Sequence, residues 1–275
     1  MYQAGIMVLD ERALTDPVLA LSQFLFGYAF ERQGRSPAYA PIARHVIEMA
    51  IATNAFWQDE EMPQRVWASF CSTLTELREG AMPNPMNNPL CSQGYSYSSK
   101  WGQKETSQPS VLQFVQHGLI EHDYNIVAWA RHMLLDDQVE TVHNDLCSIN
   151  GIGPKIASFF LRDAAWRFGI QVARQRDLLQ PVDVWVERTA HQLDPAAKGR
   201  AATWIVKESE AAGVSPEAVN AGVWYFGALI AGSEFRLFQA LNDPQRAWHM
   251  VDEYVTGLQK QVDVWRREES LYAES

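Results

Sequence analysis

Apolar side chains recur at helical spacing along most of the chain. Within residues 17–30 and 39–53 they return every three or four positions, which is typical of a helix with one buried face. Further segments of this kind span residues 63–79, 112–118, 124–135, 138–149, 155–168, 195–212, 216–227 and 243–267. No alternating run of β-branched residues is long enough to predict a sheet. The pattern therefore predicts an all-α fold.

The last of these segments, residues 243–267, is the longest. We expect its apolar side to be buried and to pack the N-terminal helix into a second lobe. This side consists of Ala247, Met250, Val251, Tyr254, Val255 and Leu258. The N-terminal helix itself begins at Thr15-Asp16-Pro17, where an aspartate precedes a proline in the first turn.

Composition narrows the class of protein. With 275 residues, 47% of them apolar, the chain can bury a sizeable core, and no apolar run is long enough to span a membrane. We therefore expect a cytoplasmic protein. The three cysteines are scattered, which predicts neither a disulfide framework nor a zinc site. The net charge of −10 argues against a protein that coats nucleic acid, although residues 150–176 carry five basic residues against one acidic residue.

Two glycines lie between apolar helical segments in Gly151-Ile152-Gly153-Pro154-Lys155. They permit a tight turn, and proline suits the first turn of the helix that follows. The expected helix-hairpin-helix, at about residues 138–168, would direct backbone N–H groups and a helix N-terminus at a phosphate. Residues Ile149, Gly151, Ile152 and Gly153 are thus the candidates for DNA binding through the backbone.

A lysine and an aspartate follow in positions that suit glycosidic-bond cleavage. Lys155 lies just inside the second helix, where apolar neighbours would favour the neutral, nucleophilic amine. Asp183, after Pro181 and Val182, could orient that amine and offset positive charge on a sugar. Taken alone, Lys155 is better explained as an exposed lysine, and Asp183 as a helix N-cap. Their combination with the glycine hairpin favours catalysis.

The same residues carry a family resemblance. The run from Leu146 to Ala157, followed by Pro181-Val182-Asp183, resembles the signature of the helix-hairpin-helix, Gly/Pro-Asp (HhH-GPD) DNA glycosylases, and most of all the archaeal 8-oxoguanine enzymes. The resemblance implies a two-lobed helical fold in which residues 1–35 and 183–275 form one lobe, residues 36–182 form the other, and a catalytic cleft lies between them. It also implies that Lys155 is the Schiff-base lysine and Asp183 the catalytic aspartate. With no cysteine after Cys147, the iron–sulfur cluster of some relatives is excluded.

The resemblance extends to a base pocket, with departures that leave the base open. Trp224 and Pro181 match positions that face the extruded base, whereas Asn220 replaces an acidic residue and Val18 replaces a glutamine. An amide both donates and accepts hydrogen bonds, so it can select a different base. The leading substrate is an 8-oxoguanine-like base, and a hypermodified bacteriophage base, removed in phage defence, is the alternative.

Two further segments are candidates for DNA contact. Asn54 loosely matches a residue that fills the space left by the flipped base, and is equally explained as a turn asparagine. Residues 80–109 read as an irregular loop whose aromatic and basic side chains suit a DNA-facing role. These are Tyr95, Tyr97, Lys100, Trp101 and Lys104.

The sequence thus predicts a monomeric DNA glycosylase, with AP-lyase activity, that acts on double-stranded DNA with a flipped base. We expect no required metal or other cofactor, although the resemblance leaves room for a monovalent cation at the hairpin carbonyls. The first alternative is a DNA-binding protein that uses the hairpin without catalysis. The second is a helical protein-interaction domain, which the acidic net charge of −10 favours.

Overall fold

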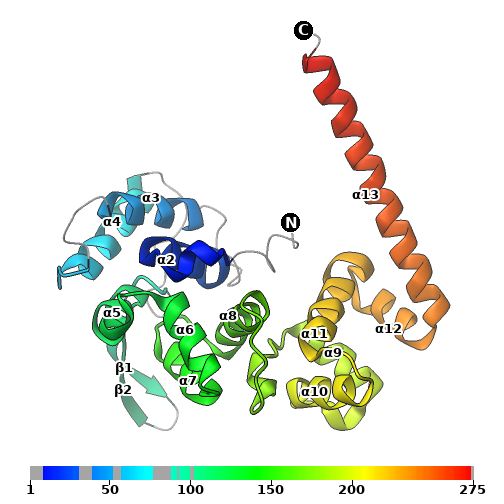
Figure 1. Cartoon of the computed structure of the whole chain (residues 1–275), viewed down its shortest axis with the longest axis horizontal. Coiled ribbons are helices and arrows are strands. Elements are labelled where there is room, and N and C mark those ends of the chain that lie inside the picture. The colour runs from blue at the N-terminus through cyan, green and yellow to red at the C-terminus, as the bar shows by residue number, and fades with distance from the viewer. Residues whose placement is uncertain are drawn as a thin grey trace. The chain divides into compact units, whose positions relative to one another are not determined.

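The chain folds into two compact units, Met1–Pro181 and Val182–Ser275, in the computed structural model. The structure describes residues 9–30, 39–51, 57–76, 88–91, 93–99 and 102–273. Figure 1 colours the first unit from blue to green and the second from yellow to red. The described residues are mainly helical, which confirms the predicted all-α class at that level, with one β-hairpin as a departure.

The first unit is built from helices, three of which begin at a capping side chain, that of Asp16, Ser110 or Asn125. Its α-helices are α2 (Pro17–Phe24), α3 (Tyr39–Ile51), α4 (Met62–Glu76), α5 (Val111–Gly118), α6 (Ile126–Leu135), α7 (Val139–Ser148) and α8 (Pro154–Arg167). Shorter pieces are the 3-10 turns η1 (Glu11–Leu14), η4 (Ile120–His122) and η5 (Arg176–Leu179) and the π-helical η2 (Leu25–Ala29). Asp16 caps α2 as predicted, because its carboxylate accepts hydrogen bonds from the backbone N–H of Val18 and Leu19, each 3.0 Å long.

The β-hairpin occupies part of the segment that was expected to be an irregular loop. Strands β1 (Gln93–Ser99) and β2 (Gly102–Gln108) pair antiparallel. Their sequences, QGYSYSS and GQKETSQ, contain no β-branched alternation, which is why the apolar pattern did not predict them. The backbone register pairs Gln93 with Gln108 and Ser99 with Gly102. Two of the residues singled out in this loop, Lys100 and Trp101, lie outside the described residues.

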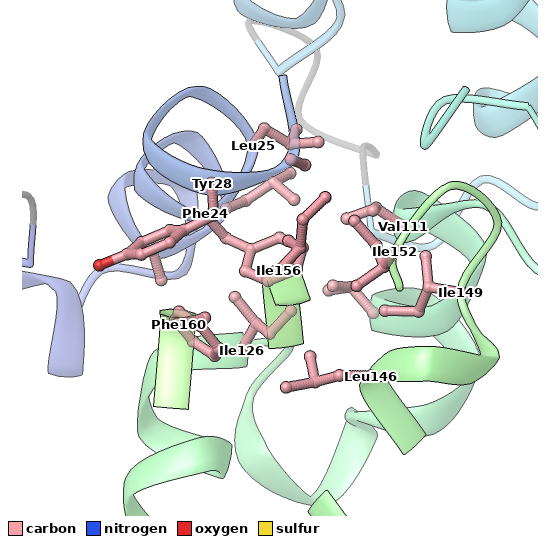
Figure 2. Close-up of a cluster of buried hydrophobic side chains, with 14 of the residues drawn as sticks. Phe24, Leu25, Tyr28, Val111, Ile126, Leu146, Ile149, Ile152, Ile156 and Phe160 are labelled. Atoms are coloured by element: carbon pink, nitrogen blue, oxygen red, sulfur yellow. The ribbon is translucent and has the colours of Figure 1, made fainter. Parts of the chain in front are cut away.

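A single hydrophobic core organises the first unit around α8. The ring of Phe160 packs edge-on against Phe24 and Tyr28, with centroids 4.9 and 5.3 Å apart (Figure 2). The hydroxyl of Tyr28 donates a 3.1 Å hydrogen bond to Asp163, and the same carboxylate accepts from the guanidinium of Arg162 at 2.8 Å. These groups are buried, so the carboxylate and guanidinium satisfy each other inside the core.

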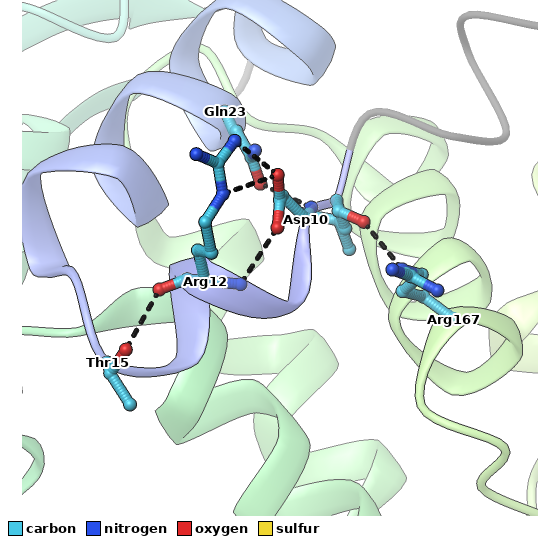
Figure 3. Close-up of polar contacts among 6 residues, drawn as sticks. Asp10, Arg12, Thr15, Gln23 and Arg167 are labelled. Carbon is cyan, nitrogen blue, oxygen red and sulfur yellow. Dashed lines mark hydrogen bonds and ion pairs between the residues drawn. The ribbon is translucent and has the colours of Figure 1, made fainter.

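The N-terminal segment belongs to this unit. Arg167, at the end of α8 (Figure 3), donates a hydrogen bond to the backbone carbonyl of Leu9, 2.9 Å away. The side chain of Asn125, the N-cap of α6, donates to the carbonyl of Ala13 at 2.7 Å. The described part of residues 1–35, which the sequence grouped with the C-terminal lobe, packs on α6 and α8. The apolar side of α2 and η2 fits the core of the first unit, which the helical period alone could not reveal.

The second unit is a smaller helical assembly. Its elements are α9 (Val184–Leu193), η6 (Pro195–Ala197), α10 (Ala201–Ala211), α11 (Pro216–Tyr225), the π-helical η7 (Phe226–Ala231), α12 (Glu234–Asn242) and α13 (Pro244–Ala273). Its core is made of small side chains, among them Val186, Ala190 and Ile205. At Gly227 the chain passes so close to α9 that an added Cβ would lie 2.9 Å from the Cβ of Trp185. Glycine at this position allows η7 to pack directly on α9.

Helix α13 corrects one expectation. Met250 is buried as predicted, but Val255 and Leu258 are 56% and 41% exposed. The stripe was predicted to be covered because buried helices show such stripes, yet α13 runs beyond α12, the helix against which its first part packs (Figure 1). No helix among the described residues has the length and apolar character needed to cross a membrane.

Candidate functional site

The turn between α7 and α8 adopts the tight geometry that its glycines predict. Gly151 has a φ of 75°, in the left-handed region that favours glycine. The backbone N–H of Ile152 donates to the carbonyl of Ile149 at 3.0 Å and closes the turn. Gly153 is extended, with φ −99° and ψ 175°, and Pro154 begins α8. We refer to residues 139–167 as the α7–α8 hairpin.

Apolar side chains anchor this hairpin in the core. Ile149, Ile152 and Ile156 are buried, and Figure 2 places them with Leu146 and Val111 in one cluster. The backbone N–H groups of Ile149 and Ile152 already donate to the carbonyls of Leu146 and Ile149. Two of the four predicted DNA-binding residues therefore hold the turn in shape, and their N–H groups are already used within it. The sequence did not reveal this packing role, because the same isoleucines fit both the turn motif and a buried apolar face.

The N-terminus of α8 is open on the side of Gly153. This residue is the N-cap, and because it lacks a side chain, no side-chain hydrogen bond occupies the cap. A Cβ built on Gly153 would meet no heavy atom within 4 Å. The uncapped N–H groups and the dipole of a 14-residue helix favour an anion at such a position. The geometry is thus compatible with a phosphate held by the backbone.

Lys155 is the second residue of α8 and lies beside this open end. Its side chain is partly buried, and it forms no ion pair with a described residue of the first unit. The other basic residues counted nearby are mostly neutralised: Arg162 pairs with Asp163, Arg167 with Glu11 and Arg174 with Asp137. Fewer basic side chains are therefore available to contact DNA than the sequence predicted. Arg162 is excluded for a second reason, since it is only 2% exposed.

The β-hairpin is rooted on the same turn. Asn150, between α7 and Gly151, is fully buried, and its side chain donates to backbone carbonyls in the segment that precedes β1. Its backbone N–H donates to the carbonyl of Pro109, just after β2, at 2.9 Å. One residue of the α7–α8 hairpin thus binds both ends of the β1–β2 segment. The residues around Asn150 in the sequence do not indicate that its side chain binds carbonyls about 60 residues away, so this role could not be predicted.

Asp183 is the N-cap of α9 in the second unit. One of its carboxylate oxygens, Oδ1, accepts hydrogen bonds from the backbone N–H of Trp185 and Val186, at 2.9 and 3.0 Å. The capping role weighed in the sequence analysis is therefore confirmed. No hydrogen bond from a described residue of the second unit reaches Oδ2. The cap therefore uses only one of the two carboxylate oxygens. The cap fixes the side chain in one orientation.

The residues predicted to line a base pocket lie on several elements. Asn220 and Trp224 share one face of α11, with Asn220 1% exposed and Trp224 partly buried against the core of the second unit. Val18 is partly buried on α2, and Pro181 is the last residue of the first unit. Asn54 lies outside the described residues. The amide at position 220 is thus buried.

A pocket of about 490 Å³ between α3 and α4 had no signal in the sequence. Its polar wall includes His45, Asp59, Arg65, Ser69 and Thr73. Arg65 pairs with Asp59 and lowers the pKa of that carboxyl. Because Arg65 and Asp59 pair with each other, their charges are compensated within the pocket. We therefore assign this pocket no part in the predicted base excision.

The described residues contain no group of three or more His, Cys, Asp or Glu side chains that could hold a metal ion. The structure places Lys155 on the α7–α8 hairpin and Asp183 at the N-cap of α9. Comparison of the chain with family models, curated proteins and solved structures finds no match.

Proposed function

We propose that this protein is a DNA glycosylase of the helix-hairpin-helix type with associated AP-lyase activity. In this proposal the α7–α8 hairpin binds the DNA backbone, Lys155 is the nucleophile and Asp183 stabilises the cationic sugar. The observation that carries the proposal is the open N-terminus of α8, where the glycine cap and Lys155 are neighbours. A purely structural turn would gain from a capping Ser or Asp at position 153.

Three features of the hairpin support DNA binding. Gly151 forms the turn, Gly153 leaves the helix end uncovered, and the isoleucines fix both in the core. A rigid, uncovered helix N-terminus binds phosphate without reading the base, which is what an enzyme that scans for rare bases requires. Because its net charge is −10, the chain as a whole is not attracted to DNA electrostatically, so binding has to come from such local phosphate contacts.

The chemistry follows from a primary amine and a carboxylate. The neutral amine of Lys155 attacks C1′ of the deoxyribose as the bond from C1′ to the base breaks, and the base leaves with the electron pair and takes up a proton. Asp183 offsets the positive charge that develops on the sugar ring. Loss of a proton from the new ammonium and opening of the sugar ring give a Schiff base. Elimination of the 3′-phosphate then cuts the strand.

The excised base is an 8-oxoguanine-like purine in the first form of the proposal. The resemblance in the α11 segment supports it, since Trp224 offers an aromatic surface for a flat base. The amide of Asn220, in place of an acidic group, supports a second candidate, a hypermodified bacteriophage base. Either base must leave the helix stack to be reached.

Borohydride trapping tests the lysine directly. The protein is incubated with duplexes that carry oxidised, deaminated, alkylated or phage-type modified bases, and sodium borohydride reduces any Schiff base to a stable protein–DNA adduct. We expect base release and an adduct with one class of base, and neither with Lys155→Gln. The matched control is Lys207→Gln, because Lys207 is exposed and pairs with Glu208 in the second unit.

Each other outcome has a defined meaning. Base release without an adduct, or an adduct with Lys155→Gln, would remove Lys155 from its role. DNA binding without release of any base in the panel would favour the non-catalytic DNA-binding protein. Absence of DNA binding at low salt would refute the proposal as a whole.

A further inference from the structure

Helix α13 extends well beyond the part that its own unit covers (Figure 1). Near its start Met250 is buried, and the hydroxyl of Tyr254 lies 3.3 Å from that of Tyr225. From Val255 to Arg266, every side chain is exposed. A helix with a long exposed stretch is only marginally stable in water unless another surface covers it. The outer part of α13 is therefore expected to pack against another surface.

An apolar seam of a specific period runs along α13, and each of its members is exposed except Val251, which is half-buried. Its members are Trp248, Val251, Val255, Leu258, Val262 and Trp265, separated alternately by three and four residues. This spacing averages 3.5 residues, the repeat of a coiled coil, rather than the 3.6 of a helix on a globular core. The side chains of Trp248 and Trp265 are 70% and 65% exposed, which is unusual for tryptophan. We call these six residues the α13 seam.

The α13 seam is complementary to itself when two copies run in opposite directions. Trp248 then faces Trp265 of the second copy, Val251 faces Val262, and Val255 faces Leu258. All six residues find a partner, and none is left facing water. Such pairing through one two-fold axis uses the same patch on both chains.

Charges beside the seam select the antiparallel arrangement. Asp252 and Arg266 each follow a seam residue, so both lie on the same flank of the helix. In the antiparallel pair Asp252 of one copy lies opposite Arg266 of the other, and symmetry repeats this contact. In a parallel pair, Asp252 would instead lie beside Ala247 and Arg266 beside Gln261. Only the antiparallel arrangement matches opposite charges.

We propose that α13 pairs with α13 of a second copy in an antiparallel two-stranded coiled coil, so that the protein is a dimer. The sequence alone led to the expectation of a monomer. The dimer does not depend on the proposed enzymatic activity.

Light scattering on the full chain, coupled to size exclusion, tests the dimer. We expect a mass of twice the 31.2 kDa of one chain. Leu258→Glu places a carboxylate at the centre of the seam and should weaken the dimer by at least about 100-fold. The matched control is Thr256→Glu, an exposed position on the opposite side of the same turn, which should leave the dimer intact. Far-UV circular dichroism verifies that both variants remain folded.

A charge exchange tests the direction of pairing. Asp252→Arg and Arg266→Asp should each weaken the dimer, by about five- to tenfold, because like charges then face each other twice. The double exchange should restore the wild-type affinity. A monomer at every concentration, or a dimer that survives Leu258→Glu, would overturn the proposal. Failure of the double exchange to restore affinity would overturn the antiparallel arrangement.

Discussion

The side-chain amide nitrogen of Asn150 lies 3.0 Å from the carbonyl oxygen of Asn88 and donates a hydrogen bond to it. The same amide donates to the carbonyl of Cys91 at 2.8 Å. These carbonyls precede β1, while the backbone N–H of Asn150 binds the residue after β2. Asn150 thus connects the α7–α8 hairpin to both ends of the β-hairpin, through its side chain and its backbone N–H.

Replacement of Asn150 should destabilise the first unit. Asn150→Ala leaves two buried carbonyls without this donor, which costs about 2–4 kcal/mol of the free energy of unfolding. Asn150→Asp keeps the shape of the side chain but removes both N–H donors, so it should not restore stability. Urea denaturation followed by circular dichroism measures both effects.

The control for this prediction is Asn242→Ala. Asn242 is exposed at the end of α12, and its amide donates one hydrogen bond to the carbonyl of Phe238 at 2.9 Å. Its loss should change the free energy of unfolding by less than about 0.5 kcal/mol. Equal effects at positions 150 and 242 would contradict a special role for the buried amide.

Substitution by alanine should have different effects at the two glycines of the turn: mainly on stability at Gly151 and mainly on DNA binding at Gly153. Gly151→Ala forces alanine into the left-handed region and should cost about 1–2 kcal/mol of stability. Gly153→Ala should cost less than about 1 kcal/mol of stability, because alanine is a poorer N-cap than glycine but the backbone is extended and the Cβ would meet open space. The added methyl group covers the end of α8, however, and should weaken DNA binding by about tenfold.

Fluorescence anisotropy on duplex DNA at several salt concentrations measures this second effect. If Gly153→Ala bound DNA as tightly as the wild type, the phosphate would not approach this face of α8. Retained stability in Gly151→Ala would contradict the left-handed turn.

Local signals in the sequence predicted the helices well and their partners poorly. Asp16, Gly151 and Pro154 act within a few residues, so their effects on helix starts and on the turn can be inferred from the sequence. The partner of Asp163 is Tyr28, 135 residues away, and no periodicity reveals such a pair. For the same reason Arg162 was counted as a DNA-facing cation although it is buried.

In the candidate site, too, local features could be predicted from the sequence and long-range packing could not. Lys155 and Asp183 were singled out by their spacing in the sequence, and the structure places both at helix starts. The isoleucines of the turn were assigned to DNA binding because a motif does not distinguish residues that shape a surface from residues that form it. The β-hairpin was missed because its strands are polar and are held through backbone pairing and Asn150.

The capping and catalytic roles of Asp183 can be separated by two substitutions. Asn is as effective an N-cap as Asp, so Asp183→Asn should keep the stability of the second unit. Asp183→Ala removes the cap and should cost about 1 kcal/mol. Both variants lack the negative charge and should lose base excision while they still bind DNA. Excision by Asp183→Asn at the wild-type rate would show that the charge is dispensable.

A buried histidine lies inside the α7–α8 hairpin. The imidazole of His143 packs between Ser158, whose Oγ lies 3.3 Å from Nε2, and Cys147, whose Sγ lies 3.8 Å from Nδ1. Burial lowers the pKa of His143 below its ordinary value, because the protonated form loses its hydration. The folded protein therefore holds this imidazole neutral at a pH where the unfolded chain protonates it.

This difference predicts how stability depends on pH. Below the unfolded pKa of about 6.5 the unfolded chain binds more protons than the folded chain, so stability falls as the pH falls, and the loss levels off below the lowered pKa of the folded state. His143→Gln should remove this component, so that its unfolding free energy falls less than that of the wild type between about pH 7.5 and 5. Urea titrations at a series of pH values measure the difference. The control is His249→Gln on α13, where the imidazole is exposed and the wild-type profile should persist. Parallel profiles for the wild type and His143→Gln would mean that the hairpin tolerates a charged imidazole.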